Sequence, residues 1–492
     1  MEFDARRMEN DYTEIIQRLP LSLRLAYGTG HVLNDICASI WFTYLLVFFH
    51  LVLGFDPTLC GVVLLIGQIA DAMVTPFVGL HSDRNDDFWL CRYGRRKTWH
   101  LLGTVCVILA FPFIFSPCVG CENAHQGAQL VYYAAFVVIF QFGWAAVQIS
   151  HLSLVPELTP TDHERTQLIA IRYTFTVFSN VLVYCIMWGV LHITSDQGAD
   201  AQIGPGDVHK FQKVVLIGIG IGLVASLIFH VFLKEGANGN GDTNDVLRRN
   251  TRTASVLLKD TKLYQVACVY MSTRLYINLC QVYIPMYLHV SLSMPAASLA
   301  YIPLAMFLSS FLMSLFIERL NTKLGRKIAY SIGALLAICA SVWIQFGNSD
   351  TYIKYEIYPV AVLLGSAGSI MLVTSLGICA DLIGQNTESG AFVYGVMSFM
   401  DKLSNGFAVM LIQYLVKRCS TSCNNYYRDI LTYVCGGSAI FGLLMILYMR
   451  PFSHDMAYST LHHNGNEDRD PSIENLANEG AEVSFTGHAH VT

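Results

Sequence analysis

Several ionisable side chains lie within stretches of this chain that are otherwise long and hydrophobic. They comprise two carboxylates, three cations and two imidazoles: Asp35, Asp71, Arg172, Arg274, Lys402, His31 and His151. An ionisable residue in hydrocarbon is expensive, so it persists where it faces a partner or a watery cavity. The pattern therefore predicts that these charges face one another inside a bundle of apolar helices.

The charge types fit a small zwitterion, which carries a carboxylate and an ammonium group. We expect Arg172 or Arg274 to bind the carboxylate, because arginine can donate two parallel hydrogen bonds to it. Asp35 would bind the ammonium group, with Gln148 and Asn278 as hydrogen-bonding side chains. A neutral sugar would not need both signs of charge. The alternative is that these residues form fixed pairs that only set how the helices pack.

The two histidines could belong to the same site. His31 lies four residues before Asp35, which places both on one helical face. His151 precedes Pro156, and a proline removes a backbone hydrogen bond and can kink a helix. His151 could therefore contact the substrate or brace the broken end of its helix.

Lys402 and Asp71 are interpreted as a coupling switch. Lys402 can neutralise Asp71 in one state and release it to a proton in another, which would replace a sodium ion. Asp401, next to Lys402, is expected to face a polar neighbour or the helix exterior and is not assigned as a ligand. Histidine titrates near the pH range between cytosol and an acidic lumen, so proton linkage is an open alternative.

The elements that must position these residues are membrane-spanning helices. The chain has 492 residues, of which 53% are hydrophobic and 14% charged, and its mean hydropathy is +0.45. Such a composition excludes a string of soluble domains. A spanning helix needs about 20 mostly apolar residues, and twelve such runs are present: 24–53, 58–80, 98–118, 127–152, 171–192, 211–233, 263–290, 296–317, 327–347, 355–380, 391–416 and 428–449.

Basic residues predict the orientation. The first run is too long for a cleaved signal, so it is read as a retained helix, and both termini then share one side. Outside the spans and in their terminal turns, that side carries 22 Lys and Arg residues and the other side 6. The side with the termini is therefore predicted to be cytosolic.

The chain is predicted to consist of two six-helix halves. The expected segments are a cytosolic head, two bundles joined by a flexible linker and a disordered tail: 1–23, 24–233, 234–262, 263–449 and 450–492. The loop RYGRRK at 92–97 matches TKLGRK at 322–327. The residues through which the chain leaves the fourth run, Pro156, Glu157 and Leu158, also match those through which it leaves the tenth run, Ala380, Asp381 and Leu382. In the first run His31 and Asp35 lie four residues apart, and in the seventh run Arg274 and Asn278 have the same spacing, so the two pairs are expected to be equivalent. Repeated halves with a shared site near the midplane are typical of secondary transporters.

Fourteen cysteines are present, most of them scattered singly through apolar runs as buried thiols. Cys118 and Cys121, and Cys419 and Cys423, lie in predicted loops on the non-cytosolic side. Disulfides are plausible there if the compartment is oxidising, and zinc binding is the alternative. The spacing alone does not determine the connectivity.

The chain resembles the major facilitator superfamily and, within it, the glycoside-pentoside-hexuronide:cation symporters. The stretches that carry the resemblance are VLNDICASIWFTYLL, GQIADAMVTPFVGLHSDR with RYGRRK, HLSLVPELT, HERTQLIAIRYTFT and ADLIGQNTESGAFVYGVMSFMDKLSNG. The resemblance implies an all-α membrane protein of twelve helices in two pseudo-symmetric bundles. FPFIFSPCVGC and ISHLSLVPELT are most similar to a branch whose implied role is cysteine import into lysosomes and melanosomes, affecting pigmentation.

Four residues match functional positions of that family. The resemblance implies that Asp35 is the first-helix carboxylate that holds substrate in sugar symporters, and that Asp71 is one carboxylate of the cation site. Lys402 matches the eleventh-helix lysine near that site, and Arg172 matches an arginine in the family's fifth-helix pattern.

Three departures put sodium coupling and sugar binding in doubt. Thr75 stands where a second cation-site carboxylate is expected, one turn after Asp71. Gln148 replaces a sugar-binding aspartate, and Leu152 replaces a stacking tryptophan.

Two loops resemble the superfamily's cytosolic gating motif, in which charge pairs break and reform between the halves. The residues concerned are Asp83, Arg84, Gly94, Arg95 and Arg96 in the first half and Gly325 and Arg326 in the second. Ordinary anchoring by positive charge would explain the basic residues but not Asp83 or Gly94.

The expected function is transport of a small amino acid, with cysteine implied by the resemblance, from cytosol into lysosomes and melanosomes. The alternatives are a sugar/cation symporter and a non-transporting sensor or partner-binding protein. No cofactor, metal, nucleic acid or enzymatic activity is expected, and an ATP-driven pump is disfavoured because no phosphate-binding loop occurs. Tyr12 and Tyr458 begin short motifs of the type that sorting adaptors read; membrane lipids would surround the bundle.

Overall fold

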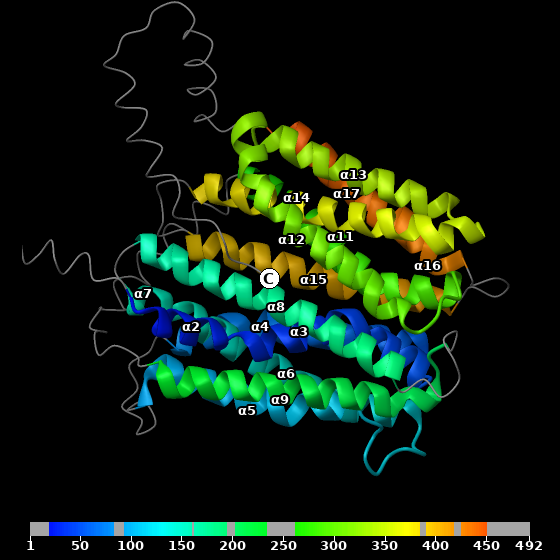
Figure 1. The fold of residues 1–492 in the computed structure, drawn as a ribbon, viewed down its shortest axis with the longest axis horizontal. Coiled ribbons are helices and arrows are strands. Elements are labelled where there is room, and N and C mark those ends of the chain that lie inside the picture. The colour runs from blue at the N-terminus through cyan, green and yellow to red at the C-terminus, as the bar shows by residue number, and fades with distance from the viewer. Residues whose placement is uncertain are drawn as a thin grey trace, which may run out of the picture.

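The computed structural model describes residues 19–82, 93–159, 162–193, 202–233, 261–383, 390–417 and 425–449. The regular structure of these residues is helical throughout, and no strand occurs among them (Figure 1). Most of the predicted head, most of the predicted linker and the tail lie outside the described residues.

The first half contains six helical runs, several of them divided by a local change of helix type. In order they are α2 (Leu21–Thr29) with α3 (Val32–Val47) and η1 (Phe48–Val52); α4 (Pro57–Ser82); α5 (Arg95–Ile114); α6 (Gln126–Ser153) with α7 (Val155–Leu158); α8 (Asp162–Ile193); and η3 (Pro205–Asp207) with α9 (Val208–Phe232).

The second half repeats this order. Its runs are α11 (Thr261–Met286) with η4 (Tyr287–Ser291); α12 (Ser298–Leu324); α13 (Arg326–Phe346); η5 (Tyr352–Glu356) with α14 (Ile357–Ile383); α15 (Gly390–Val416); and α16 (Tyr426–Asp429) with η8 (Ile430–Cys435) and α17 (Gly436–Tyr448). The twelve predicted runs therefore correspond to the twelve helical runs of the described chain.

Ten of these runs are long and apolar enough, among the described residues, to cross a membrane. The two others are α11 with η4, and α15. These are the helices that carry Arg274, and Asp401 with Lys402. Their lower hydropathy is consistent with a position inside the bundle, where other helices shield the charges from lipid.

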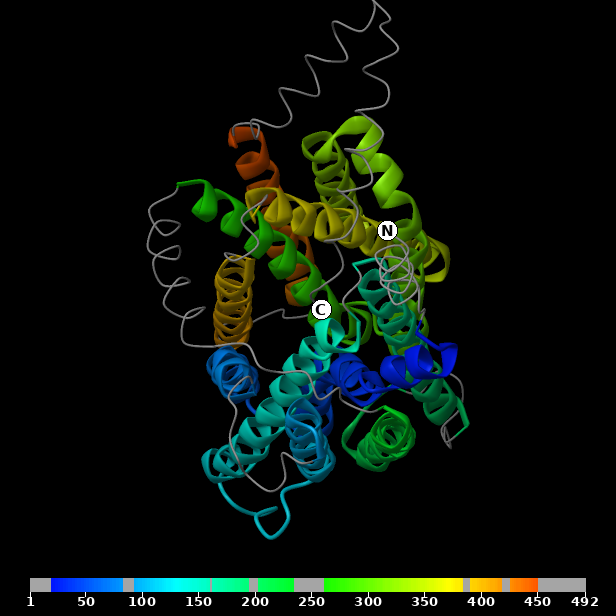
Figure 2. The ribbon, with the colours of Figure 1, turned by 90° about the vertical axis from the view of Figure 1, so that its left-hand side faces the viewer.

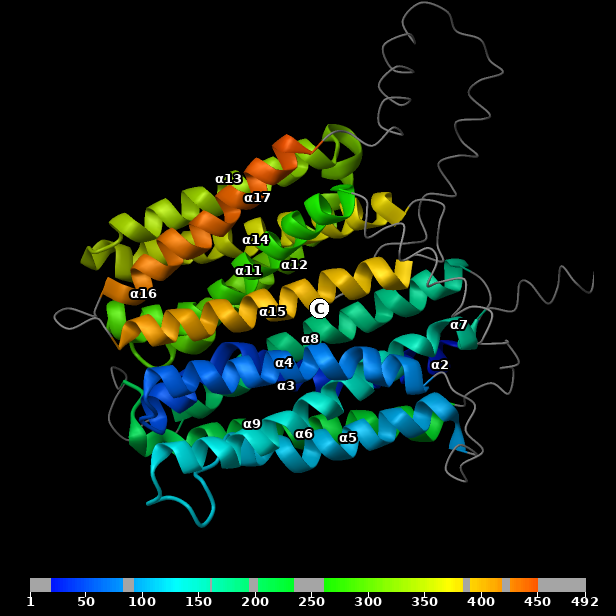
Figure 3. The same cartoon turned by 180° about the vertical axis from the view of Figure 1, so that it is seen from behind.

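Each half forms its own layer of helices (Figure 1). The halves meet along three helix pairs, α4 with α15, α8 with α12, and α3 with α11. Figure 3 shows α15 running beside α4 along most of its length, and Figure 2 shows the bundle approximately end-on. Residues on α4, α8, α11 and α15 are therefore placed at or near the contact between halves.

The first helix of each half ends in the same unusual way, and this corrects the predicted correspondence between the halves. Residues 48–52 and 287–291 are π-helical, with bonds from Leu53 N–H to Phe48 O and from Leu292 N–H to Tyr287 O. A positive-φ residue follows each, Gly54 at 65° and Ser293 at 50°.

Matching these two segments moves the alignment by one helical turn. Asp35 and Arg274 each lie thirteen residues before their π-helical segment begins. Arg274 is therefore the counterpart of Asp35, and the alignment of Arg274 with His31 and of Asn278 with Asp35 was wrong. The two halves thus present opposite charges at equivalent positions.

The third helix of each half begins with a matching set of contacts. Gly94 and Gly325 are the N-cap residues of α5 and α13, with φ of 122° and 79°, a region that favours glycine. Lys97 donates to the carbonyl of Leu233, the C-cap of α9, at 2.6 Å.

The second half repeats that lysine contact. Lys327 donates to the carbonyl of Met449, the C-cap of α17. A cation at the carboxyl end of a helix is stabilised by the partial negative charge of its last carbonyls. In each half, a lysine on the third helix therefore holds the end of the sixth.

Candidate functional site

Lys402 joins the two halves near their middle. Its Nζ lies 2.7 Å from Asp71 Oδ1 on α4 and donates to Thr75 Oγ1 at 2.8 Å. Thr75 in turn donates to Asp71 Oδ1 at 3.0 Å. The predicted partners therefore form one closed triangle of contacts between α15 and α4.

Thr75 has a definite role in this triangle. Its hydroxyl accepts from the ammonium group of Lys402 and donates to the carboxylate of Asp71, which a second carboxylate could not do while ionised. The ammonium group of Lys402 is therefore the cation that neutralises Asp71 in this structure.

Asp401, the neighbour of Lys402, belongs to a different cluster. Arg274 on α11 donates from Nε to Asp401 Oδ2 at 2.8 Å. Asn405 and Asn278 donate to Asp401 Oδ1 at 2.7 and 3.4 Å. Asp401 is only 4% exposed, so it faces a neighbouring polar cluster, which is one of the two positions expected for it.

Arg274 and Asn278 are thus engaged within the second half in this structure. Successive residues of an α-helix differ in direction by about 100°, so Asp401 and Lys402 can serve different helices. Asp401 pairs inside its own half, and Lys402 pairs with the other half.

A third cluster lies inside the first half. His31 Nδ1 is 2.9 Å from Asp35 Oδ1, and Arg172 Nη2 on α8 is 2.9 Å from His31 Nε2. Thr176 donates to Asp35 Oδ2 at 2.9 Å. Both carboxylate oxygens of Asp35 therefore have hydrogen-bond donors, and all three ionisable groups are buried.

His151 and Gln148 on α6 form hydrogen bonds and ring contacts outside these three clusters. His151 Nε2 lies 2.8 Å from the carbonyl of Tyr27, and the two rings are stacked with centroids 4.2 Å apart. Gln148 accepts from Trp144 Nε1 at 3.0 Å. Because α6 ends at Ser153, His151 braces the end of its helix against α2, as one of the two interpretations expected.

Most of the predicted residues therefore form three clusters, each with both signs of charge, while His151 contacts Tyr27 and Gln148 contacts Trp144. Three partners of these residues were not predicted from the sequence: Tyr27, Thr176 and Asn405. Thr176 and Asn405 lie four residues after Arg172 and Asp401, so helical spacing could have indicated them.

One end of the molecule is closed by contacts between the halves. Lys417 Nζ on α15 lies 2.8 Å from Asp56 Oδ2, just before α4. The hydroxyl of Tyr44 donates to the carbonyl of Leu299 at 3.0 Å. A half-open cavity at this end is lined by Asp56, Thr58, Leu59, His125, Gln126, Tyr414 and Lys417.

At the opposite end, the gating arginines pair within their own halves. Arg96 Nη1 lies 3.0 Å from Glu157 Oε1, and Arg326 Nη2 lies 2.8 Å from Asp381 Oδ1. Glu157 and Asp381 lie at equivalent places, at the ends of the fourth and tenth predicted runs. Arg95 lies in α5, but its side chain is outside the described part, as are Asp83 and Arg84.

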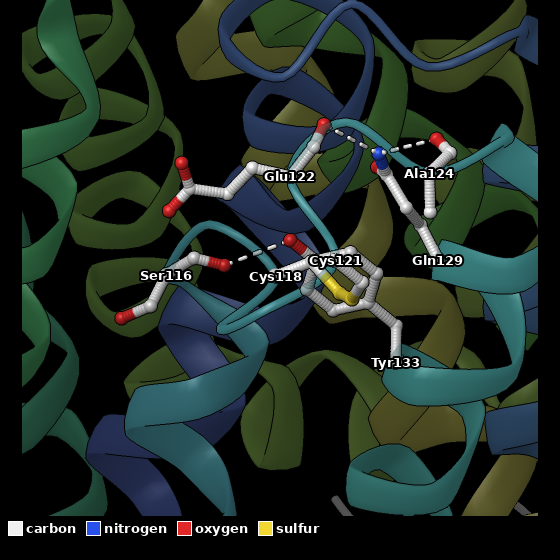
Figure 4. Close-up of a disulfide and its surroundings, with 7 residues drawn as sticks. All are labelled: Ser116, Cys118, Cys121, Glu122, Ala124, Gln129 and Tyr133. Atoms are coloured by element: carbon white, nitrogen blue, oxygen red, sulfur yellow. Dashed lines mark hydrogen bonds between the residues drawn. A yellow bond between two sulfur atoms is a disulfide. The ribbon is translucent and has the colours of Figure 1, made fainter.

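Cys118 and Cys121 are disulfide-bonded in the loop between α5 and α6 (Figure 4). The adjacent Tyr133 donates to the carbonyl of Ser116 at 2.8 Å. The bond closes a short loop at the same end as the Asp56 contact. Cys419, Cys423, Tyr12 and Tyr458 lie outside the described residues.

Two six-helix halves that enclose opposite charges near their contact are the architecture of a membrane transporter. The xylose transporter XylE from E. coli, in a partially occluded inward-open conformation, has this fold. It superimposes with a TM-score of 0.64 at 13% identity, covering 88% of this chain and 98% of XylE.

The chain belongs to the major facilitator superfamily, since the family described as MFS/sugar transport protein matches residues 26–453. It is 45% identical over 450 residues to the human major facilitator superfamily domain-containing protein 12 and 44% identical over 448 residues to the mouse protein. Each comparison covers 87% of this chain and 93% of the relative.

Proposed function

We propose that this protein is a secondary active transporter of a small zwitterionic amino acid, with cysteine as the candidate substrate, and that it works by alternating access. The observation that carries the proposal is the bond of Lys402 to Asp71 and Thr75 between the halves. A transporter that rocks its halves about a central site must exchange the contacts that join them. A partly buried ammonium group between the halves is suited to that exchange because its buried partner carboxylate can take a proton instead.

The substrate class is supported by the two charge clusters on either side of this contact. Arg172 with Asp35 in one half, and Arg274 with Asp401 in the other, place a guanidinium and a carboxylate together. A carboxylate and an ammonium group could replace these internal partners pairwise. Cysteine itself is supported by the resemblance described above rather than by the geometry.

The proposed location is the lysosomal and melanosomal membrane, with both termini in the cytosol and transport directed into the lumen. The excess of basic residues on the side of the termini supports this orientation. An epitope on either terminus should be accessible to antibody in intact lysosomes without detergent. Protection of both termini would reverse the orientation.

The test is uptake of labelled cysteine into isolated lysosomes or proteoliposomes by the parent protein and by Lys402→Ala. We expect at least a tenfold loss, since removal of the ammonium leaves Asp71 buried without its charge partner. Lys354→Ala, at an exposed lysine on η5, is the matched control and should transport normally.

Equal uptake by the parent and Lys402→Ala would remove Lys402 from the mechanism. Absence of uptake by the properly folded parent, for cysteine and for a panel of amino acids and sugars, would favour a non-transporting sensor. Sodium-driven sugar uptake would instead establish the alternative symporter.

A further inference from the structure

The first half contains four histidines that form a continuous array through its interior. Ring centroids are 5.6 Å apart for His31 and His151, 6.1 Å for His151 and His100, and 4.9 Å for His100 and His230. His31 is 1% exposed, and His151 and His100 are fully buried. Among the described residues no His, Cys, Asp and Glu side chains converge as metal ligands would, so the array requires another explanation.

The contacts of His31 determine which of its nitrogens carries the proton. A guanidinium can only donate, so His31 Nε2, 2.9 Å from Arg172 Nη2, must be an unprotonated acceptor. The proton is then on Nδ1, which donates to Asp35 Oδ1. His31 is therefore neutral while it holds Arg172.

A second set of contacts leads from the molecular surface toward this cluster. The partly exposed Tyr93 lies with its hydroxyl 3.0 Å from His230 Nδ1, and His230 Nε2 lies 3.1 Å from His100 Nδ1. His100 Nε2 lies 2.9 Å from the carbonyl of Gly30, the residue before His31.

The direction of this chain follows from its last acceptor. The carbonyl of Gly30 can only accept, so His100 carries its proton on Nε2 and accepts at Nδ1. His230 must then donate from Nε2, which leaves its Nδ1 as an acceptor for the hydroxyl of Tyr93; that hydroxyl also lies 3.1 Å from the carbonyl of His230. Every donor points inward from Tyr93.

His151 lies between the end of this chain and His31. Its Nε2 donates to the carbonyl of Tyr27, while its Nδ1 has no hydrogen-bond partner among the described residues. Centroid distances of 5.6 and 6.1 Å to its neighbours are short enough for a ring rotation or one bridging water to complete a path.

We propose that His31 is a proton-binding site that controls Arg172, and that His151, His100, His230 and Tyr93 form the proton path between it and the face that bears the termini. This inference rests on the proposed transport function and identifies a co-transported proton and its site. Because the proton moves with the substrate, import into an acidic lumen must be driven by the concentration gradient of the substrate.

The step conserves charge. A proton that binds His31 Nε2 creates an imidazolium that still donates from Nδ1 to Asp35 but can no longer accept from Arg172. The cluster of Asp35, His31 and Arg172 changes from net zero to one positive charge. Arg172 is then available to a substrate carboxylate, whose negative charge offsets that of the added proton within the cluster. Because the substrate also carries an ammonium group, the complex with a zwitterion keeps one net positive charge, which is the charge of the proton. Loss of the proton reverses the exchange and expels the carboxylate.

The surrounding groups are compatible with this exchange. The titratable and charged groups near His31 are Asp35 on its own helix, Arg172 on α8, His151 on α6, His100 on α5 and Tyr27 on α2, with His230 and Lys97 beyond His100. Asp35 supplies the negative charge within hydrogen-bond distance of His31.

The first test follows protons and substrate together in proteoliposomes that contain a trapped pH indicator. The parent should move a single proton with each substrate molecule and respond to an imposed pH gradient. In His31→Gln the number of protons moved per substrate molecule should fall at least tenfold. Glutamine can accept a hydrogen bond from Arg172, but it does not titrate. His209→Gln, at an exposed histidine at the start of α9, is the control.

The second test does not depend on transport. In protein labelled with ¹⁵N-histidine, the signals of His31 and His100 are identified by their absence from the spectra of His31→Gln and His100→Gln. In the parent at neutral pH, these signals should show the Nδ1–H form for His31 and the Nε2–H form for His100. Acidification should protonate His31, and Arg172→Lys should shift that titration.

The outcomes separate the two proposals. Parent protein that exchanges substrate without proton movement, or His31→Gln that keeps the parental ratio, overturns this inference but not the transport function. If the parent exchanges no substrate, the transport function fails, and an Nε2–H form of His31 then overturns the inference independently.

Discussion

At the residue scale, the adjacent pair Asp401 and Lys402 shows what the sequence could and could not predict. Hydropathy indicated that both charges needed partners, and family resemblance connected Lys402 with Asp71. The partner of Asp401 is Arg274, 127 residues away in the chain. Neighbours on a helix point in directions about 100° apart, and only the packing of α11 against α15 determines which direction meets a cation.

The ion pair of Asp401 and Arg274 should be important for stability. Asp401→Leu leaves a buried guanidinium without its charge partner, and breaking a buried pair in this way costs about 3–5 kcal/mol. Thermal unfolding of the purified protein should shift downward by several degrees. The double variant Asp401→Leu, Arg274→Met should recover most of the loss, since neither charge is then buried alone. A double variant no more stable than the single one would contradict this account.

At the element scale, the twelve runs were predictable because their length and hydropathy are local properties. The correspondence between the halves was not, because pairs of polar residues four apart match equally well one helical turn away, and the π-helical segments that set the alignment have no clear sequence signal. The matched segments at Phe48 and Tyr287 show the true alignment. The break after Ser153 was foreseeable from Pro156, which lies in the first turn of the short α7.

Helices α5 and α6 approach closely at two glycines. A Cβ on Gly143 would lie 2.7 Å from the carbonyl oxygen of Gly103, which is backbone and cannot rotate away. We expect Gly143→Ala to force the helices apart and destabilise the protein by about 1–3 kcal/mol, measured as a lower thermal unfolding temperature.

Gly189→Ala on α8 is the control for this packing. A Cβ at Gly189 meets nothing within 4 Å, and alanine is a better helix former than glycine by up to about 1 kcal/mol. This variant should therefore be neutral or slightly stabilised. Similar losses in both variants would mean that helix contact at Gly143 is not the cause.

At the scale of the whole molecule, the halves are joined in the middle by Lys402 and at one end by Lys417 with Asp56. Exposure of the site to that end requires these two contacts to break, together with the hydrogen bond of Tyr44 to Leu299. The clusters around Arg172 and Arg274 lie within single halves and can move as rigid parts. The structure therefore separates the contacts that must change between states from those that need not.

The contact at the closed end should resist acid. The hydrogen bond from Lys417 lowers the pKa of Asp56 below its ordinary value of 3.8. A depressed carboxyl pKa means that the pair persists above that pKa and is lost only as pH falls through it. At about pH 5, the acidic end of the histidine range, Asp56 should still be ionised.

Spin labels on non-natural amino acids at the exposed Asn123 and Lys354 can follow the separation of this end. Their distance distribution should be the same at pH 7 and pH 5 if the Lys417 contact alone controls it. Asp56→Asn should broaden the distribution toward longer distances at both values. Opening of the parent at pH 5 without any change in Asp56→Asn would assign the closure to other groups.

The lysines that hold the ends of α9 and α17 have a consequence for biosynthesis. Lys97 and its acceptor Leu233 are 136 residues apart, so the ribosome must finish the sixth helix before the third can make this contact. Each half is thus complete only at its last turn, and a nascent chain that stalls earlier exposes an ammonium group near the bilayer. Two fragments divided within the central connection, translated separately, should each satisfy their own lysine before they associate.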